Sequence, residues 1–290
     1  MIEQYLIHLL ILFGIYLILS LALNLNAGYT GLINFSIISF FGIGAYTFVL
    51  LISNGFYFIS SLIFVVILSL IASFVLNFFT KNLKKDYFAT ASLAFSFLVY
   101  SIFLNFVFLT KGPYGISITK TIFIFGFPIY SSIHYLLMIW IAVILFVVVL
   151  VLLKKSNILS FFIALKNNEN KLKTLGKNTS TIRFYSLAIS AIFSALAGAF
   201  FAVYVSYIHP SQFTLTEFVI ILTMVIIGGV GSFRGTAIGV IFVIFLTEGI
   251  RFLNISNTII GPLRQIMYSS ILIILLLYNK KGFFGKMDFD

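Results

Sequence analysis

The chain contains no cysteine and is poor in charge, with 18 basic and 7 acidic side chains among 290 residues. Without cysteine, disulfides, thiol catalysis and cysteine-ligated metal sites are excluded. Charged residues form 9% of the chain, whereas soluble domains carry about 25%. Hydrophobic residues form 61%. This composition predicts an all-α, polytopic membrane protein rather than a large water-soluble core.

Groups that could perform catalysis or bind metals are equally scarce. The candidates near or within apolar segments are Asp86, Glu217, Glu248, His8, His134 and His209. None has metal-ligand spacing and no two acids share a helical face, so the sequence predicts no enzyme, no metal site and no cofactor. Glu248 and Arg251 stand three residues apart, which favours a local ion pair. Glu217 lies near the end of an apolar segment and is a poor candidate for ion coupling.

Nine apolar segments are long enough to cross a bilayer, for which about 17–25 residues are needed. They cover residues 5–26, 32–52, 56–80, 87–109, 134–153, 184–207, 217–234, 235–252 and 263–278. We expect a multi-pass protein of the cell membrane, in contact with lipid, with one transmembrane domain over residues 1–290. The first segment lacks the basic start and cleavage site of a signal peptide, so we expect it to remain in the membrane.

Lysine-rich clusters at residues 81–85, 154–183 and 280–286 predict the orientation. Two and then four predicted crossings separate them, so all three can lie on one side. The positive-inside bias places that side, and with it the C-terminus, in the cytoplasm. The N-terminus and Lys111 are then external. Because the net charge of +11 is concentrated in these loops without interleaved aromatics, nucleic-acid binding is not expected.

Two glycine-rich stretches, Gly28–Tyr46 and Gly228–Gly239, interrupt the apolar segments. Irregular backbone survives at membrane depth only where it is buried in protein or lines a wet cavity. The first stretch is equally consistent with a broken helix at a substrate pathway and with glycines that let helices approach closely. For the second stretch, two short helices joined by a turn are favoured over a binding site.

Residues 154–183 are too polar to lie in hydrocarbon, with seven basic side chains and one acid, Glu169. An apolar stripe at helical intervals is formed by Phe161, Leu165, Leu172 and Leu175. The stripe predicts a short amphipathic helix at the membrane face, which Gly176 ends and after which Thr179 or Ser180 caps the next helix. Such a helix either rests on lipid headgroups, which is the commoner arrangement for basic segments, or docks into a soluble partner.

Seven stretches of the chain form a recognisable series: Ala22–Thr47, Asp86–Phe95, Thr110–Ile116, Ala164–Phe184, Ser194–Thr214, Met224–Gly239 and Leu263–Gly285. They include "ALNLNAGYTGLINFS", "DYFATASLAF", "TKGPYGI" and "MVIIGGVGSFRGTAIG". In this order they resemble the permease subunits of branched-chain amino-acid ABC importers, of the LivM type. Each motif alone is weak, but the ordered series is specific and covers most of the chain.

The resemblance implies an ABC-permease-like bundle with broken helices, forming half of a pathway for branched-chain or other neutral amino acids. It implies a second permease subunit of the related LivH type, two cytoplasmic ATPase subunits that bind ATP, and an external substrate-binding protein. The coupling helix that docks into the ATPase would then lie within residues 154–183 and use Phe161, Leu165, Glu169, Leu172, Leu175 and Gly176. Polar candidates for the lining of the pathway are Asn34, Ser36, Ser39 and Tyr46.

The chain departs from this family at several positions. Ile37, Phe97 and Tyr100 stand where relatives commonly carry polar or charged residues, and Lys280-Lys281 replaces an arginine-proline pair. These changes leave the solute open, and a small polar solute such as urea is an alternative. An ion-coupled secondary carrier would instead transport without an ATPase. A polytopic enzyme of lipid or glycan metabolism would require Glu217 or Glu248 as an indispensable acid.

Overall fold

The computed structural model describes residues 2–118, 123–124, 127–128, 131–251 and 257–278. Its elements in chain order are α1 (Ile2–Asn24), the π-helix η1 (Leu25–Thr30), α2 (Ile37–Ser53), α3 (Phe58–Thr80), α4 (Lys85–Asn105), α5 (Val107–Thr110), η2 (Gly112–Tyr114), β1 (Ile116–Ser117), β2 (Phe123–Ile124), β3 (Phe127–Pro128), α6 (Ser132–Lys155), α7 (Asn157–Asn167), α8 (Glu169–Thr174), α9 (Thr179–Val205), β4 (Tyr207–Ile208), η3 (Pro210–Phe213), α10 (Leu215–Gly228), α11 (Phe233–Arg251) and α12 (Asn257–Tyr278). The predicted all-α class is confirmed, because each described strand is only two residues long.

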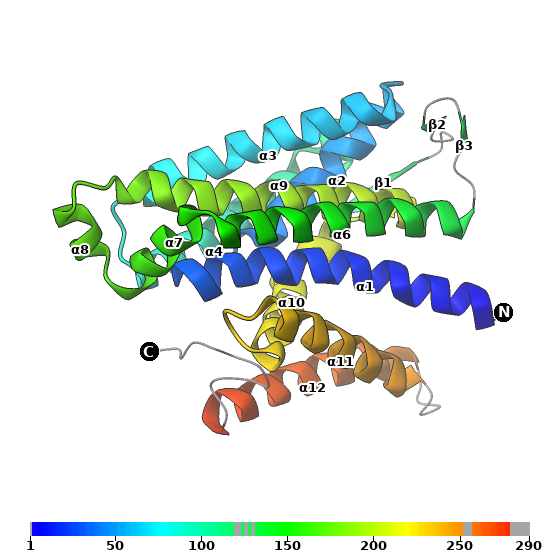
Figure 1. The fold of residues 1–290 in the computed structure, drawn as a ribbon. Helices are drawn as coiled ribbons and strands as arrows, with labels where there is room; N and C mark the ends of the chain where they lie inside the picture. Colours follow the sequence, from blue (N-terminus) through cyan, green and yellow to red (C-terminus); the bar gives the residue numbers. More distant parts are fainter. Residues whose placement is uncertain (1, 119–122, 125–126, 129–130, 252–256, 279–290) are drawn as a thin grey trace.

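The predicted membrane segments are present as helices (Figure 1). Among the described residues, 8 helical segments are long and apolar enough to cross a membrane, and α2 adds a shorter apolar helix. Together they match the nine predicted segments. Several boundaries differ by a few residues: α2 begins at Ile37 rather than 32, and α9 at Thr179 rather than 184. The turn between the seventh and eighth segments lies at residues 229–232, not at 234–235, because α10 already ends at Gly228.

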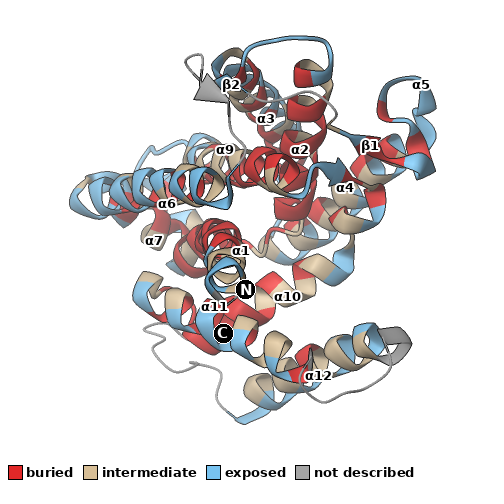
Figure 2. Ribbon diagram, turned by 90° about the vertical axis from the view of Figure 1, so that its right-hand side faces the viewer, coloured by how far each residue is buried: buried red, intermediate tan, exposed pale blue. Residues whose placement is uncertain are grey.

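Helix α9 lies at the centre of the bundle and packs against α2 and α3, with α1 and α6 alongside (Figure 2). Glycines allow an unusually close crossing of α2 and α9. A Cβ added to Gly44 would lie 1.9 Å from the carbonyl oxygen of Ala195, and one added to Gly198 would lie 1.9 Å from that of Phe41. Each helix therefore places a glycine directly against the backbone of the other, as small residues do in membrane interfaces.

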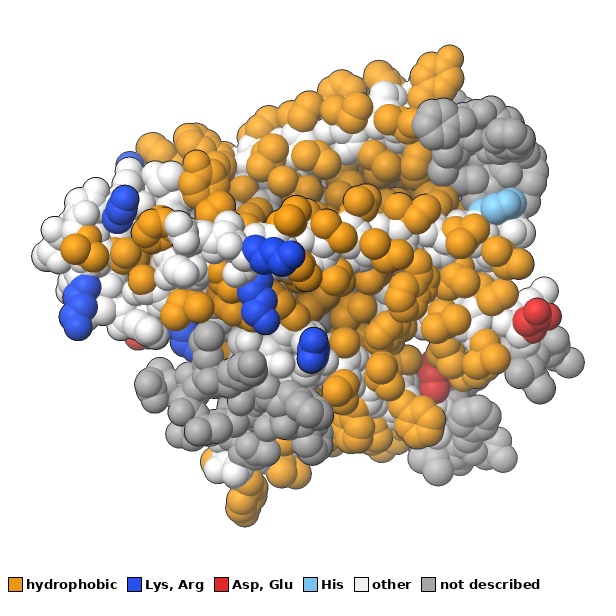
Figure 3. Space-filling model, in the orientation of Figure 1, with side chains coloured by type: hydrophobic (Ala, Val, Ile, Leu, Met, Phe, Trp, Pro, Cys, Tyr) orange, Lys and Arg blue, Asp and Glu red, His pale blue; other side chains and the backbone are white. Residues whose placement is uncertain are grey.

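The face of the bundle drawn in Figure 3 is largely apolar between its two ends. Large exposed hydrophobic side chains lie along α3, α6, α11 and α12, for example Phe74, Leu145, Phe245 and Leu277. Such a surface would be unstable in water but is matched to hydrocarbon. Lysine and arginine side chains gather at the end of the bundle where α7 and α8 lie.

A short antiparallel strand pair lies at the C-terminal end of α9, the end away from α7 and α8. β1 pairs with β4, with Ile116 opposite Ile208. The His209 ring also bonds the Pro113 carbonyl through Nε2 at 2.8 Å. The loop that contains Lys111 is thereby held near the C-terminal end of α9, away from the segment of α7 and α8.

The two glycine-rich stretches contact each other inside the bundle. The Asn24 side chain, at the start of η1, accepts a hydrogen bond from the Gly231 amide at 2.8 Å and donates to the Thr236 hydroxyl at 2.6 Å. A Cβ on Gly28 would lie 2.6 Å from the Gly231 nitrogen. The irregular backbone of the first stretch is therefore buried in protein. The second stretch forms two helices joined by a turn, as predicted.

Candidate functional site

The polar segment 154–183 folds as two short helices, which corrects the prediction of one amphipathic helix. Asn168 has an extended backbone, with φ −160° and ψ 99°, and separates α7 from α8. Its side-chain oxygen accepts a hydrogen bond from the Lys171 amide at 3.1 Å and so caps α8. Asn168 therefore ends α7 and begins α8. The spacing of apolar residues alone does not reveal such a break.

The predicted apolar stripe is accordingly divided between the interior and the surface. Leu165 is 1% exposed and Leu172 is 4% exposed, so both pack within the chain itself. Leu175 is 73% exposed. Phe161 is half-buried, with the Lys177 ammonium 5.5 Å from its ring centroid. Of the predicted apolar anchors, Leu165 and Leu172 therefore stabilise the segment, Phe161 is partly accessible, and Leu175 is the most exposed.

Gly176 ends α8 as predicted, with a left-handed φ of +71°. The Lys177 amide bonds the Leu172 carbonyl at 3.1 Å, and the Gly176 amide bonds the Lys173 carbonyl at 3.0 Å. This pair of bonds is the Schellman arrangement that glycine favours. The cap of α9 differs from the prediction: Asn178, rather than Thr179 or Ser180, accepts from the Ser180 amide at 3.1 Å.

Arg183 and Glu169 form the main polar contact of this region. The Arg183 side chain is 2% exposed, and its Nη2 forms a salt bridge with Glu169. Its Nη1 donates to the Leu83 carbonyl at 2.8 Å and to the Thr80 carbonyl, at the end of α3, at 3.4 Å. A guanidinium is well suited to this position, because the last carbonyls of a helix lack partners and carry partial negative charge. Arg183 therefore joins the α3–α4 loop to α8.

Glu169 is held in its ionised form by this environment. Partial burial alone would raise the pKa of its carboxyl, but the hydrogen bond from Lys173 and the charge of Arg183 outweigh it and lower the pKa below its usual value. The Thr179 hydroxyl donates to the same carboxylate at 3.1 Å. Glu169 was predicted as a contact residue of the coupling region, whereas Arg183 was counted only among the basic side chains of that region. No spacing in the sequence indicates this pair, because the break at Asn168 brings the two residues together.

The first two lysine clusters lie at the same end of the bundle. Lys85 donates through Nζ to the Lys166 carbonyl at 2.5 Å. Together with the Arg183 contacts, this bond places residues 81–85 against α7 and α8 (Figure 1). The agreement in sidedness between the clusters at 81–85 and 154–183 is thus confirmed. The third cluster, 280–286, lies outside the described residues.

The four predicted pathway residues are all buried in and beside α2, namely Asn34, Ser36, Ser39 and Tyr46. The structure joins the first two: the Ser36 amide donates to the Asn34 side-chain oxygen at 3.1 Å. Ser39 and Tyr46 lie further along α2, where the Tyr46 ring stacks on Phe103 at 4.4 Å between centroids. Asn34 Nδ2, Ser39 Oγ and the Tyr46 hydroxyl have no hydrogen-bond partner among the described residues. Their role in transport remains a prediction.

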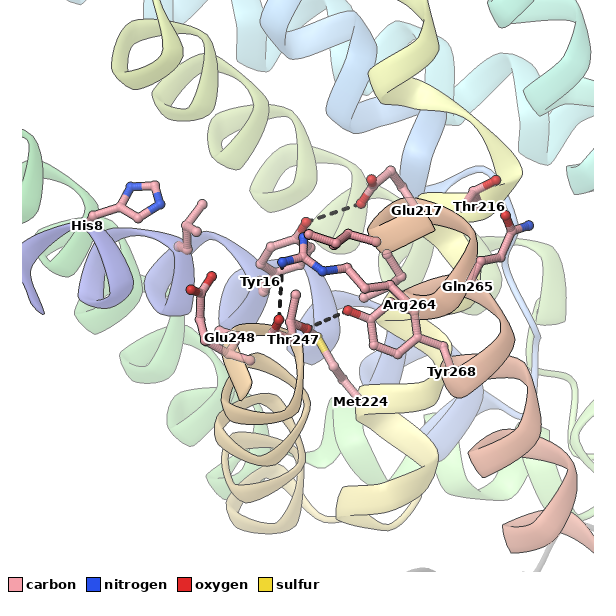
Figure 4. A pocket seen from close by; sticks show the side chains of 15 residues that line it. His8, Tyr16, Thr216, Glu217, Met224, Thr247, Glu248, Arg264, Gln265 and Tyr268 are labelled. Atoms are coloured by element: carbon pink, nitrogen blue, oxygen red, sulfur yellow. Dashed lines mark hydrogen bonds between the residues drawn. The ribbon is translucent and has the colours of Figure 1, made fainter. Parts of the chain in front are cut away.

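A polar cavity of about 560 Å³ lies elsewhere, between α1, α10, α11 and α12 (Figure 4). None of the four predicted pathway residues lines it. The Tyr16 hydroxyl donates to the Glu217 carboxylate at 3.1 Å, and Arg264 Nη2 donates to the Thr247 carbonyl at 3.1 Å.

Sequence reasoning missed Arg264, although a lone arginine within an apolar segment is itself a signal of function. Glu217, set aside as an ion-coupling acid, faces this cavity. Glu248, which also lines the cavity, accepts a hydrogen bond from the Tyr5 hydroxyl at 2.6 Å. The side chain of Arg251, its predicted partner, lies outside the described residues.

Comparison with known proteins identifies the family of this bundle. The protein family described as the permease component of the branched-chain amino acid transport system matches residues 5–278, nearly the whole chain. The chain belongs to this family. The high-affinity LivM permease of Salmonella typhimurium is 28% identical, over 92% of this chain and 67% of its own length, and the Escherichia coli LivM gives the same figures. A probable LivM of Methanocaldococcus jannaschii is 28% identical over 94% of this chain and 90% of its own length. No solved structure matches.

The family assignment explains the absence of a catalytic constellation in the sequence. The curated relatives are permease proteins of transport systems. The chain is a multi-pass membrane permease subunit of the ABC importer type, and the predicted family and fold class are both confirmed.

Proposed function

We propose that the chain forms half of the translocation pathway for branched-chain or other neutral amino acids. The second half would be a LivH-type permease subunit, two cytoplasmic ATPases would bind and hydrolyse ATP, and an external binding protein would deliver the solute. The family match over residues 5–278 is the observation that carries this proposal. Co-expression with these partners should give ATP-driven uptake of labelled leucine into vesicles. Uptake of urea but not leucine, or ion-driven uptake by the chain alone, would favour the alternatives.

The α7–α8 segment is the proposed contact with an ATPase. It is joined to the bundle at the start of α9 through Arg183 and to the α3–α4 loop through the same side chain. A displacement of α8 would therefore be transmitted directly to the central helix. The exposed Leu175, which follows α8, offers an apolar side chain to a partner.

Orientation is tested first, since this proposal requires α7 and α8 to face the cytoplasm. The chain contains no cysteine, so single cysteines can be introduced without removing others. We expect Lys84→Cys and Lys166→Cys to react with an impermeant maleimide only from the cytoplasmic side, and Lys111→Cys only from outside. The predicted cytoplasmic C-terminus is tested with Lys281→Cys. Reaction of the first two positions from opposite sides would contradict the orientation.

Coupling is tested at Leu175, because the buried Leu172 cannot report on docking without damaging the segment. Burying a leucine side chain contributes about 1.5–3 kcal/mol, so Leu175→Asp should weaken ATPase binding about tenfold or more. Co-purification of the ATPase and ATP-driven uptake measure this loss. We expect the variant to remain folded and inserted, since Leu175 is 73% exposed.

Asn170→Asp is the matched control, because it adds the same charge to exposed surface of α8 without removing an apolar side chain. It should bind the ATPase as the unmodified chain does. Equal effects of the two variants would attribute the loss to charge alone. Normal co-purification and uptake with Leu175→Asp would rule out docking through this side chain.

A further inference from the structure

The polar cavity between α1, α10, α11 and α12 lies in the half of the bundle away from α7 and α8. Gly31, which follows the C-terminal end of α1, lies next to Lys166 of α7: a Cβ added to Gly31 would be 2.9 Å from Lys166 Cγ. The N-terminus of α1 points the opposite way (Figure 1). His8 and Tyr16, from the first two-thirds of α1, line the cavity. If α7 and α8 are cytoplasmic, as proposed above, the cavity lies toward the external side.

The start of α10 forms one wall of the cavity. α10 follows η3, and the two together make an apolar span of 19 residues. Its first turn carries Thr216 and Glu217, which face the cavity. The cavity volume of about 560 Å³ falls within the roughly 300–1,000 Å³ of small-molecule sites.

Three charged side chains, Glu217, Glu248 and Arg264, line this cavity, and Glu248 already accepts a hydrogen bond from the Tyr5 hydroxyl. Within the described part of the chain, neither Glu217 nor Arg264 forms a salt bridge. Glu217 is bonded by the neutral Tyr16 hydroxyl, and Arg264 bonds a neutral carbonyl while its Nε has no partner. Figure 4 shows Glu217, Tyr16 and Arg264 extending into the same space from α10, α1 and α12. Charged side chains within membrane segments are costly, and where they occur they pair or mark substrate and ion pathways.

The remaining wall of the cavity is aliphatic. Leu12, Ile220 and Ile244 line it beside the charged groups. The site therefore offers an anion, a cation and an apolar surface together. An α-amino acid zwitterion with an aliphatic side chain presents the complementary groups. Urea would leave both charges unpaired.

We propose that this cavity binds the transported amino acid, with Glu217 accepting hydrogen bonds from its ammonium group and Arg264 donating to its carboxylate. The assignment rests on the proposed function and adds the site and the basis of recognition. The aliphatic wall takes the side chain. Tyr16 is a positioning residue, which orients the Glu217 carboxylate.

The test uses the complete transporter and two analogues of leucine. Leucinamide keeps the ammonium group but lacks the carboxylate, and 4-methylpentanoate keeps the carboxylate but lacks the ammonium group. Competition against labelled leucine is measured on the purified complex without the external binding protein. We expect both analogues to bind at least about tenfold more weakly than leucine, since each loses a charge-assisted hydrogen bond.

The variants should alter this discrimination in a crossed pattern. Glu217→Gln should weaken leucine binding about tenfold and abolish its advantage over 4-methylpentanoate, while its advantage over leucinamide persists. Arg264→Gln should abolish the advantage of leucine over leucinamide, while its advantage over 4-methylpentanoate persists. Arg264→Lys should bind leucine better than Arg264→Gln does. If Glu217 and Arg264 had only a structural role, each substitution would weaken the binding of all three ligands by the same factor. Glu3→Gln, which removes an exposed acid at the start of α1, is the control and should change nothing.

The outcomes separate this inference from the proposed function. If the unmodified complex imports leucine but both variants keep its binding and discrimination, the cavity assignment is wrong and the proposed function stands. If the variants lose the second permease subunit while remaining folded, the charges serve subunit pairing, and the assignment is again wrong. If the unmodified complex imports no amino acid, the proposed function fails, and the assignment fails with it.

Discussion

Arg183→Ala is expected to destabilise the protein by about 1–3 kcal/mol, because it removes a buried guanidinium that bonds the Glu169 carboxylate and the Leu83 carbonyl. The substitution leaves the Glu169 carboxylate without its guanidinium and the Leu83 carbonyl without its donor, while the Thr80 carbonyl keeps the Leu83 amide. Thermal melting in detergent should show the loss of stability. Limited proteolysis should cut residues 156–178 faster than in the unmodified chain, and ATP-driven uptake should be lost.

Lys173→Ala is the matched control, since Lys173 contacts the same Glu169 but is 56% exposed. Exposed ion pairs contribute about 0–1 kcal/mol, so this variant should melt close to the unmodified protein. In the Arg183→Ala background, Glu169→Gln should recover part of the stability, because it removes a partly buried charge that only the exposed Lys173 then balances. If Arg183→Ala were as mild as Lys173→Ala, the buried contact would not hold the segment.

Gly44→Ala is expected to destabilise the bundle by about 3 kcal/mol or more, because the added methyl group meets backbone rather than a flexible side chain. Its Cβ would lie 1.9 Å from the Ala195 carbonyl oxygen and 2.5 Å from the carbonyl carbon of the same residue. The central crossing of α2 and α9 would have to separate. Yield of monodisperse protein in detergent and its melting temperature measure the effect.

Gly249→Ala tests whether glycine loss in itself is harmful. Nothing lies within 4 Å of a Cβ at Gly249, which is also helical. Alanine is favoured over glycine in helices by about 1 kcal/mol, so this variant should be as stable as the unmodified chain or slightly more stable. Equal losses for the two substitutions would mean that the close crossing does not limit stability.

Much of the architecture follows from the sequence alone. Hydrocarbon offers no partners for backbone groups, so a long apolar stretch must satisfy them within its own helix. For this reason the nine predicted segments reappear as apolar helices, and the lysine clusters at 81–85 and 154–183 lie at one end. Gly176 was also predictable, because a local stop signal depends on a few adjacent residues.

The family was predictable for a different reason. Seven short motifs in a fixed order carry information that neither hydropathy nor periodicity contains, and the family match over residues 5–278 agrees with them. Hydropathy alone would have predicted a membrane bundle of unspecified kind.

Tertiary structure decided which side chains are available and which are paired. Leu172 and Leu175 belong to the same predicted stripe, yet one is 4% exposed and the other 73%, because the break at Asn168 redirects the chain. Glu169 pairs with Arg183, and Asn24 bonds Gly231, 207 positions away. Glu217 and Arg264 face one cavity although they belong to different helices. Local sequence determines where a helix forms, but these contacts join residues distant in the chain, and only the packing of the helices brings such residues together.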